Sequence, residues 1–471
     1  MTTNLFNIDT TLAQLISSEI AYQYRIVPTG KVGEVPVFKT DNNALKSLQQ
    51  ELEVILGFAV LVEKEGSTKI DRYLLTNYRQ RTIKKQTESL SFTDDFLLNM
   101  LFEAKETGSS DIHFEAFEKQ SRVRFRIDGK LIEKYVISGK EYPKIVNRIK
   151  IMASLDISEK RLPQDGRISL STEGEDFDIR VSSLPTLHGE KLVLRILAKN
   201  GVVVTLDELG FTSQELETYK SSVKKPNGIV LISGPTGSGK TTTLYATLKL
   251  LNTNDTNILT IEDPIEYTLE GVNQVQLKED IGLDFSSTLR TFLRQDPDII
   301  MVGEIRDANT ANMAIRAALT GHLVLSTIHT NSAWATVSRL IDMGIPPFLI
   351  ASTLNVSVAQ RLVRKLCEHC KSASDIHQQD FPKGFIIPSN LQSQYKAIGC
   401  YKCYQTGYKG RKAIYEIIPI HKELVEDIEN KKIEIGAYLK ENTIATLKDN
   451  ALLLVANGVT SVEEIYSLIH E

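Results

Sequence analysis

The sequence predicts a multi-domain α/β protein whose main domain is built on a parallel sheet, and three observations support this. The chain has 471 residues, which corresponds to about three domains at roughly 150 residues each. After Gly210, short unbroken apolar runs alternate with helical segments, which is typical of strands buried on both faces of a parallel sheet. Before Gly210, apolar and polar residues alternate instead, which predicts half-buried strands in smaller α+β domains.

The composition excludes several classes of protein. Hydrophobic residues make up 42% of the chain, enough to offset the entropy of folding, so wholesale disorder is excluded. Lys and Arg total 55 against 59 Asp and Glu, which gives a net charge of -4 and lacks the basic excess from which phosphate-backbone binding draws its affinity. We therefore expect no nucleic-acid partner. The sequence contains neither an apolar run of about 20 residues nor a signal-peptide pattern, so we expect a cytoplasmic protein with no direct membrane insertion.

Two small α+β domains are expected first. Residues 1–85 combine helical patterns with short apolar runs, and the polar stretch RQRTIKKQTES after them is expected to be a linker. A second α+β domain is predicted for residues 92–200, where a first helix should end near Gly108. The dipeptide Asp128-Gly129 lies between two alternating runs and is a strong hairpin signal. Further strands are predicted at RISLST and FDIRVSS, with a helix at YPKIVNRIKIMASLD between the hairpin and these strands.

Three further segments complete the prediction. Residues 201–365 contain the apolar strands GIVLIS, NILTI, DIIMV and LVLSTI and should form the parallel α/β domain. Residues 366–412 contain all four cysteines of the chain. Residues 413–471 are predicted to be mostly helical.

A glycine-rich loop, GPTGSGKTT, follows the strand GIVLIS and precedes a helical run. This is the context of the nucleotide-binding P-loop, in which glycines let backbone N–H groups turn inward around a β-phosphate. Lys240 can reach the β- and γ-phosphates, and the hydroxyl of Thr241 can bind Mg²⁺. We predict a nucleoside triphosphate site with Mg²⁺, and the candidate binding residues are Gly234, Pro235, Thr236, Gly237, Ser238, Gly239, Lys240, Thr241 and Thr242.

Acidic and basic residues follow three of the predicted strands. Glu304 comes just after DIIMV and is the candidate base for water activation, with Gly303 where many such enzymes carry a metal-binding Asp. Glu262 and Asp263 follow NILTI at the same sheet edge and are candidates to position the metal or water. His329 ends the third strand and is either a γ-phosphate sensor or a packed structural histidine.

The four cysteines form two C-x-x-C pairs separated by a long insert: Cys367, Cys370, Cys400 and Cys403. In a reducing compartment, such pairs indicate a metal site before they indicate disulfides.

Four segments of the sequence together resemble the secretion ATPases of the general secretory pathway E and type IV pilus assembly family, over about residues 90–471. These segments are GPTGSGKTTTLYATL, ILTIEDPIEY, LRQDPDIIMVGEIRD and GHLVLSTIHTN, which match the family's Walker A, Asp box, Walker B with glycine in place of Asp, and His box. The resemblance implies a RecA-like P-loop ATPase core. It also implies a cytoplasmic homohexamer in which ATP hydrolysis powers type II secretion pseudopilus or type IV pilus assembly.

The resemblance extends to residue roles and partners. Arg180 and Arg195 match arginines of the family's second N-terminal domain that reach the nucleotide phosphates, where they would neutralise the transferring phosphoryl group. Arg290, Arg294 and Arg306 are candidates for subunit contacts. The motor is expected to be peripheral on the inner membrane, to act on a platform protein there, and to dock on a bitopic membrane protein through its first domain.

The cysteines also fit this resemblance, since assembly and secretion members carry a tetracysteine zinc element after the ATPase core. Four thiolates suit tetrahedral Zn²⁺, and a closed site of four protein ligands has a structural role. Redox-active C-x-x-C pairs are the alternative. Pilus-retraction members lack the element, so its presence favours the assembly or secretion direction.

Two rival functions remain open. A nucleic-acid translocase on the same core would need a basic channel lined with aromatic residues, whereas this chain has one Trp and an acidic balance. A nucleotide-binding scaffold without turnover would not need Lys240, Thr241 and Glu304 together.

Overall fold

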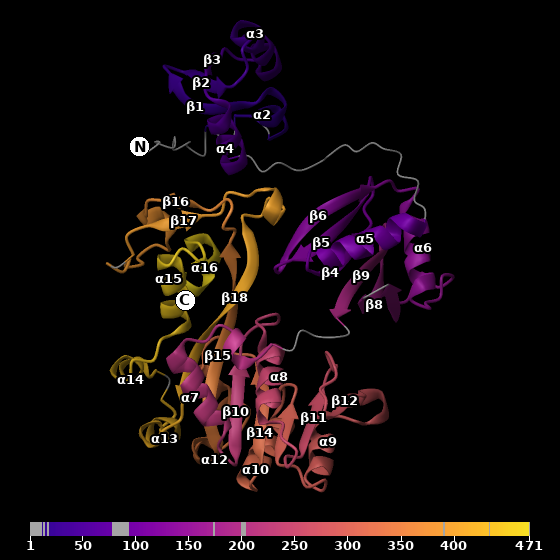
Figure 1. The fold of residues 1–471 in the computed structure, drawn as a ribbon, viewed down its shortest axis with the longest axis vertical. Coiled ribbons are helices and arrows are strands. Elements are labelled where there is room, and N and C mark those ends of the chain that lie inside the picture. The colour runs from indigo at the N-terminus through magenta and orange to yellow at the C-terminus, as the bar shows by residue number, and fades with distance from the viewer. Residues whose placement is uncertain are drawn as a thin grey trace. The chain divides into compact units, whose positions relative to one another are not determined.

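The computed structural model describes residues 12, 15–16, 18–77, 94–172, 175–198, 204–389, 391–432 and 434–470 (Figure 1). The chain divides into two compact units. One unit is drawn from Met1–Ser91, Leu366–Asp375 and Ser393–Lys409, and the other from Phe92–Lys365, Ile376–Gln392 and Gly410–Glu471. In the described part of the chain, no helix is long and apolar enough to cross a bilayer.

The N-terminal residues form a small α+β structure, as the sequence predicts. Its elements are α2 (Ser18–Tyr24), β1 (Ile26–Val32), β2 (Val35–Thr40), α3 (Leu45–Leu56), β3 (Leu61–Lys64) and α4 (Ser67–Asn77). Strand β2 lies in the middle of the sheet, antiparallel to β1 and parallel to β3. Phe38, Leu52 and Tyr73 are buried in its core. The predicted linker RQRTIKKQTES lies outside the described residues.

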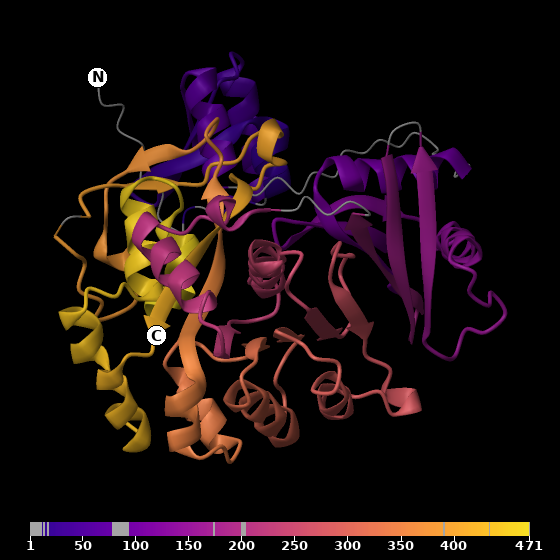
Figure 2. The same cartoon turned by 60° about the horizontal axis from the view of Figure 1, so that its bottom comes forward.

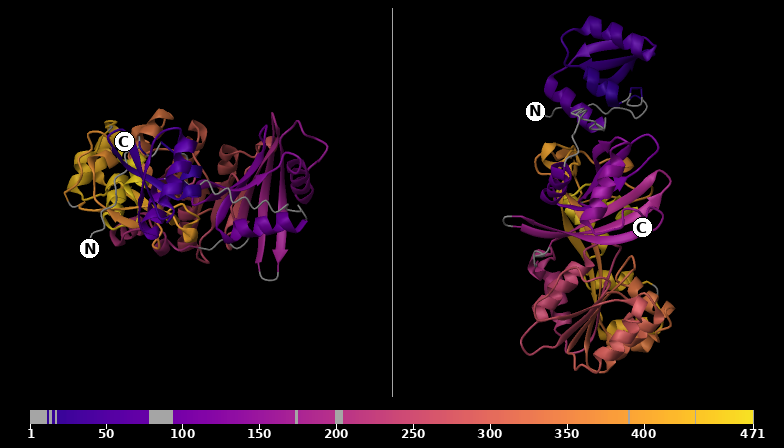
Figure 3. Two further views of the ribbon diagram at one scale, coloured as in Figure 1. Left: turned by 90° about the horizontal axis from the view of Figure 1, so that it is seen from above. Right: turned by 90° about the vertical axis from the view of Figure 1, so that its right-hand side faces the viewer.

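A six-stranded antiparallel sheet follows, in the order β6-β5-β4-β9-β8-β7. Figures 2 and 3 show its long strands from three directions. Its elements are α5 (Asp94–Glu106), β4 (Ser109–Glu115), β5 (Ser121–Ile127), β6 (Lys130–Ile137), α6 (Tyr142–Met152), β7 (Gln164–Thr172), β8 (Glu175–Thr186) and β9 (Gly189–Ala198). The predicted hairpin is confirmed, because Asp128 and Gly129 join β5 to β6 with φ angles of 47° and 82°.

The two faces of this sheet differ in chemistry. One face packs apolar side chains such as Phe114 and Phe125 against α5 and α6. The other face is charged, and there Glu115 of β4 accepts hydrogen bonds from Arg122 Nε at 2.8 Å and Arg124 Nη2 at 2.7 Å. Burial raises the pKa of Glu115, but the hydrogen bonds from these two guanidinium groups outweigh it and bring the pKa to about 2.

The central sheet of the second unit has seven strands in the order β12-β11-β13-β14-β10-β15-β18. Its strands are β10 (Gly228–Ser233), β11 (Ile258–Glu262), β12 (Asn273–Gln276), β13 (Ile299–Val302), β14 (Leu323–Ile328), β15 (Leu354–Leu366) and β18 (Tyr408–Pro419). The first six are parallel, as the unbroken apolar runs predict. Strand β18 runs antiparallel to β15, since Ile420 N donates to Asn355 O at one end and Cys367 N donates to Gly407 O at the other.

Helices cover both faces of this sheet (Figures 1 and 2). All residues of β10 are buried, and they alternate between two cores: Leu231 packs with α9 and α10, whereas Ile232 packs with α7 and α8. In the described part of the chain between β9 and β15, the α-helices are α7 (Ser213–Val223), α8 (Lys240–Leu251), α9 (Phe285–Phe292), α10 (Ala308–Leu319), α11 (Ala335–Asp342) and α12 (Pro347–Thr353). The mixed α/β fold with a parallel sheet is confirmed.

The C-terminal part departs from the prediction at its start. The expected boundaries between residues 365 and 366 and between 412 and 413 fall inside β15 and β18, so the segment predicted to be helical begins as a strand. The reason is tertiary, because β18 completes the sheet edge by pairing with β15. After it come α13 (Lys422–Glu429), α14 (Gly436–Glu441), α15 (Leu447–Ala456) and α16 (Val462–His470).

Candidate active site

The glycine-rich loop joins the buried strand β10 to helix α8, in the context that the sequence predicts. Gly234, Gly237 and Gly239 all have positive φ angles, of 149°, 79° and 89°. A Cβ at Gly234 would lie 2.5 Å from Gln360 O, and one at Gly239 would lie 2.9 Å from Gln360 Nε2. Gly234 therefore requires glycine for space as well as for backbone conformation, and Gly239 requires it for backbone conformation.

Lys240 is the first residue of α8 and is only 9% exposed. Its Nζ donates hydrogen bonds to Gly234 O at 2.8 Å and Pro235 O at 3.1 Å. Burial lowers the pKa of Lys240, and the nearby Glu304 carboxylate acts in the opposite direction. The ammonium group thus lies folded onto its own loop, at the place where it can exchange these carbonyls for phosphate oxygens.

A cleft of about 1500 Å³ opens beside this loop. Six of the nine predicted nucleotide-binding residues line it: Thr236, Gly237, Gly239, Lys240, Thr241 and Thr242. The other three predicted residues, Gly234, Pro235 and Ser238, do not border it, although the first two supply the carbonyls that hold Lys240. The cleft is also lined by residues predicted from the strand ends: Glu262, Asp263, Glu304 and His329.

Glu304 lies at the centre of a charged cluster in this cleft. Its side chain is 16% exposed and forms an ion pair with Arg306, and His329 Nε2 lies 3.3 Å from its Oε2. Arg306 Nη1 also lies 3.7 Å from Asp263 Oδ2, and its hydrogen bond with Glu304 raises the pKa of Arg306. Arg306, expected at a subunit contact, therefore pairs with the candidate base of its own chain. The other arginines expected at such contacts are exposed at and just after α9: Arg290 and Arg294.

Gly303 stands at the position where many P-loop enzymes carry a metal-binding aspartate, and its backbone packs closely against β11. The backbone N–H of Gly303 donates to Ile261 O at 2.8 Å, which draws the end of β13 against the end of β11. A Cβ at Gly303 would lie 3.2 Å from Ile261 O and 3.4 Å from Glu262 Cα. A side chain here would therefore require the end of β11 to shift by a few tenths of an ångström. The acidic residue Glu304 comes one residue later.

Glu262 is more deeply buried than its predicted role suggests, with 3% exposure. Its Oε1 accepts hydrogen bonds from Thr260 Oγ1 at 2.6 Å and Gln274 Nε2 at 3.1 Å, and its Oε2 accepts one from the hydroxyl of Tyr245. Tyr245 and Gln274 were not singled out from the sequence. Their partners are 17 and 12 residues away along the chain, so only the fold reveals the contacts.

The two arginines expected at the phosphates have different positions. Arg195 lines the same cleft and its Nε lies 2.9 Å from Asp111 Oδ1. Arg180 does not line the cleft, and its Nη2 donates to Ile265 O at 3.2 Å in the segment that follows β11.

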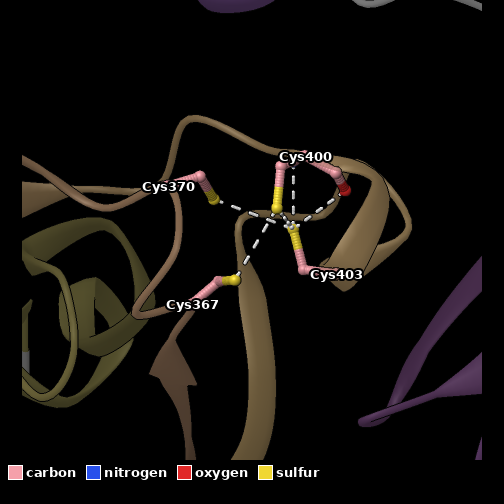
Figure 4. A group of neighbouring side chains, drawn as sticks. All are labelled: Cys367, Cys370, Cys400 and Cys403. Carbon is pink, nitrogen blue, oxygen red and sulfur yellow. Dashed lines mark hydrogen bonds between the residues drawn. The ribbon is translucent and has the colours of Figure 1, made fainter.

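The four cysteines converge, as Figure 4 shows. The sulfur atoms of Cys367 and Cys400 are 3.9 Å apart, those of Cys370 and Cys403 3.8 Å, and those of Cys400 and Cys403 3.7 Å. All four sulfurs lie within 4.8 Å of one another and none forms a disulfide. Four sulfurs placed tetrahedrally at about 2.3 Å from a zinc ion would be about 3.8 Å apart, so the cluster fits that metal.

Backbone groups support the same cluster. The N–H groups of Cys400 and Gly407 donate to Cys403 Sγ at 3.1 Å and 3.3 Å. The two ends of the insert between the cysteine pairs are held together by two short antiparallel strands, β16 (Ser372–Ser374) and β17 (Gln394–Lys396). The site is thus assembled by local contacts near both C-x-x-C pairs.

Comparison with known proteins decides the family. Residues 86–467 match the family model described as type II/IV secretion system protein. The chain belongs to this family. It is 42% identical to the type IV pilus assembly ATPase PilB of Myxococcus xanthus, over 98% of this chain and 87% of that protein. It is 46% identical to the type II secretion system ATPase E of Vibrio cholerae, over 79% of this chain and 74% of that protein.

Two solved structures agree with the fold. The pilus retraction motor PilT with bound ADP is 26% identical, with a TM-score of 0.54 over 79% of this chain and 96% of that one. The ATPase DotB of Legionella pneumophila matches with a TM-score of 0.61 over 82% of this chain and 97% of that one, and at 22% identity it supports the fold alone. The predicted membership of the secretion ATPase family is confirmed, and with it the class of enzyme.

Proposed function

We propose that this chain is a Mg²⁺-dependent ATPase that powers type II secretion or type IV pilus assembly. The observation that carries the proposal is the single cleft that brings Lys240 and Thr241 together with Glu304 and His329. Relatives that are 42% and 46% identical over the aligned residues are named as ATPases of pilus assembly and of type II secretion. The core, with its glycine-rich loop between a buried parallel strand and a helix, is then of the RecA-like P-loop type.

The loop of residues 234–242 would hold the nucleotide. Backbone N–H groups around Gly237 and Gly239 receive the phosphate oxygens, and Lys240 leaves the carbonyls of its own loop to pair with the β- and γ-phosphates. Thr241 lines the cleft with its side chain exposed, so its hydroxyl is free to ligate Mg²⁺. The metal would neutralise charge on the phosphates during transfer.

Glu304 would accept a proton from the attacking water. Its carboxylate already lies between Arg306 and His329, so water activation requires it to exchange one of these contacts for the water. His329 is half-exposed beside it and would sense whether a γ-phosphate is bound. Arg195, which lines the same cleft, would add positive charge near the phosphates. Arg180 of β8 would act through its hydrogen bond to Ile265 O, in the segment after β11.

Force would reach the membrane through partners. We propose that the chain works as a homohexamer in the cytoplasm, peripheral on the inner membrane. It would act on an inner-membrane platform protein and dock through residues 1–85 on a bitopic membrane protein. The two relatives are named for type IV pilus assembly and type II secretion, which supports the export role. The homohexamer and the membrane partners are proposed from the resemblance of the four sequence motifs.

We also propose that Cys367, Cys370, Cys400 and Cys403 hold one structural Zn²⁺. The sulfur separations of 3.7 Å to 3.9 Å match a tetrahedral thiolate site. Four protein ligands leave no open position for a substrate, so the ion would stabilise the fold rather than catalyse.

The first test is ATP hydrolysis per chain over a series of protein concentrations, with the Lys240→Ala variant as the blank and EDTA as the metal-free control. A specific rate that rises with concentration indicates that subunits complete the site together. A flat rate above the blank indicates an ATPase that needs no further assembly over that range. A rate equal to the blank contradicts hydrolysis by this chain alone.

A further inference from the structure

A buried polar network lies between helix α8 and the end of β11. Its centre is the Glu262 carboxylate, which accepts from Tyr245, Thr260 and Gln274. Tyr245 is fully buried on the helix that begins at Lys240. Burial, followed by the hydrogen bond to Glu262, raises the pKa of Tyr245 well above its usual value, so its hydroxyl keeps its proton and acts as a donor.

The same network holds the segment between β11 and β12. The backbone N–H of Glu266 donates to the Tyr245 hydroxyl at 3.3 Å, and the ring of Tyr267 packs edge-on against the ring of Tyr245, with centroids 4.6 Å apart. Gln274 accepts from Leu269 N at 2.7 Å and donates to Tyr267 O at 3.2 Å. Backbone groups of this irregular segment are thus satisfied by side chains of the network, and its position depends on them.

The far side of the network borders the charged cluster of the active site. Asp263 directly follows Glu262 and lies 3.7 Å from Arg306, which pairs with Glu304. The backbone of Gly303 is bonded to Ile261 at 2.8 Å, so the ends of β11 and β13 move together. Any shift of the end of β11 relative to α8 therefore changes the distance between Lys240 and Glu304.

We propose that Tyr245 is a positioning residue for ATP hydrolysis. Its hydrogen bond to Glu262 links the helix that begins at Lys240 to the end of β11, which lies beside Glu304. It thereby fixes the distance between the proton-accepting carboxylate and the bound phosphates. Its own hydroxyl touches neither the nucleotide loop nor Glu304, and it acts through Glu262. The inference rests on the proposed ATPase activity of the same cleft.

The decisive variant is Tyr245→Phe, which keeps the ring packed against Tyr267 and removes only the hydroxyl. We expect kcat to fall about tenfold or more, since a hydrogen bond to a charged group is lost and the alignment of reacting groups loosens. The dissociation constant for ADP should stay within about twofold, because the glycine-rich loop and Lys240 are unchanged.

Tyr219→Phe is the matched control. The hydroxyl of Tyr219 makes a buried hydrogen bond of 2.7 Å to Thr247, on the same helix α8 but away from Glu262. This variant loses one buried hydrogen bond to α8 and should be destabilised to a similar degree. Its kcat should remain within about twofold of the wild type.

Hydrogen–deuterium exchange of the peptide covering residues 263–272 provides a readout independent of turnover. Exchange there should be faster in Tyr245→Phe and unchanged in Tyr219→Phe. Three results would each overturn the positioning role while leaving the proposed ATPase activity intact. They are unchanged exchange in Tyr245→Phe, equal losses of kcat in the two variants, and a loss of ADP affinity that parallels the loss of kcat. Wild-type turnover no higher than that of Lys240→Ala would refute the proposed ATPase activity, and this inference with it.

Discussion

Replacing Lys240 by alanine removes a side chain that donates hydrogen bonds to two backbone carbonyls of the glycine-rich loop. The Nζ atom makes hydrogen bonds of 2.8 Å and 3.1 Å from a position that is 9% exposed. On nucleotide binding these two bonds would be exchanged for bonds to phosphate oxygens. Each hydrogen bond between charged groups contributes about 1.5–3 kcal/mol, so the loss is about 3–6 kcal/mol. This corresponds to a decrease of roughly a hundredfold to ten-thousandfold in kcat/KM.

The assay is steady-state ATP hydrolysis together with equilibrium binding of a fluorescent ATP analogue. Lys249→Ala is the matched control, because Lys249 lies in the last turn of the same helix and is exposed. It should retain full activity. A Lys240→Ala variant that keeps more than about a tenth of the wild-type kcat/KM would refute the assignment of this loop as the phosphate site.

Three other variants test separate parts of the molecule. Glu304→Gln should bind ATP with unchanged affinity but hydrolyse it at least about a hundredfold more slowly, because the general base is lost. A normal single-turnover rate would place water activation elsewhere. Cys400→Ser should lose its zinc and become sensitive to protease in residues 366–412, and one zinc per chain in the purified variant would count against the site. Glu115 has a pKa of about 2 in the folded protein, below its ordinary value of 4.5, so it contributes stability above pH 4.5 that is lost as the pH falls toward 2. The difference in melting temperature between wild type and Glu115→Gln should therefore shrink over this range, and a constant difference would contradict the paired state.

Local signals in the sequence predicted much of the core. The strand GIVLIS is buried at every residue and enters the glycine-rich loop directly, so the elements that present Lys240 can be predicted from a short stretch of chain. Asp128 and Gly129 likewise specify their hairpin through their own backbone preferences. Such features are determined by residues adjacent in the sequence, so local sequence patterns are sufficient to predict them.

Features that depend on contacts between distant parts of the sequence were harder to predict. No pattern in the sequence indicates that the hydroxyl of Tyr245 meets Glu262, because the two residues belong to different elements. Arg306 carries no signal in the sequence that distinguishes an ion pair with Glu304 from a contact with another subunit. The strand character of residues 413–419 follows from pairing with β15, which is a partner distant in sequence. In each case the contacting partner belongs to another element, and only tertiary packing brings the two elements together.

The close approach of the two strand ends at Gly303 has a consequence for how this motor can evolve. With Ile261 O only 3.2 Å from where a Cβ would stand, selection at this position acts on volume before it can act on charge. An aspartate or even an alanine here would require the end of β11 to give by a few tenths of an ångström. Substitutions that retune metal affinity without moving this strand end are expected at other positions bordering the cleft, and a search for relatives that demands an acidic residue at this point would pass over chains built in this way.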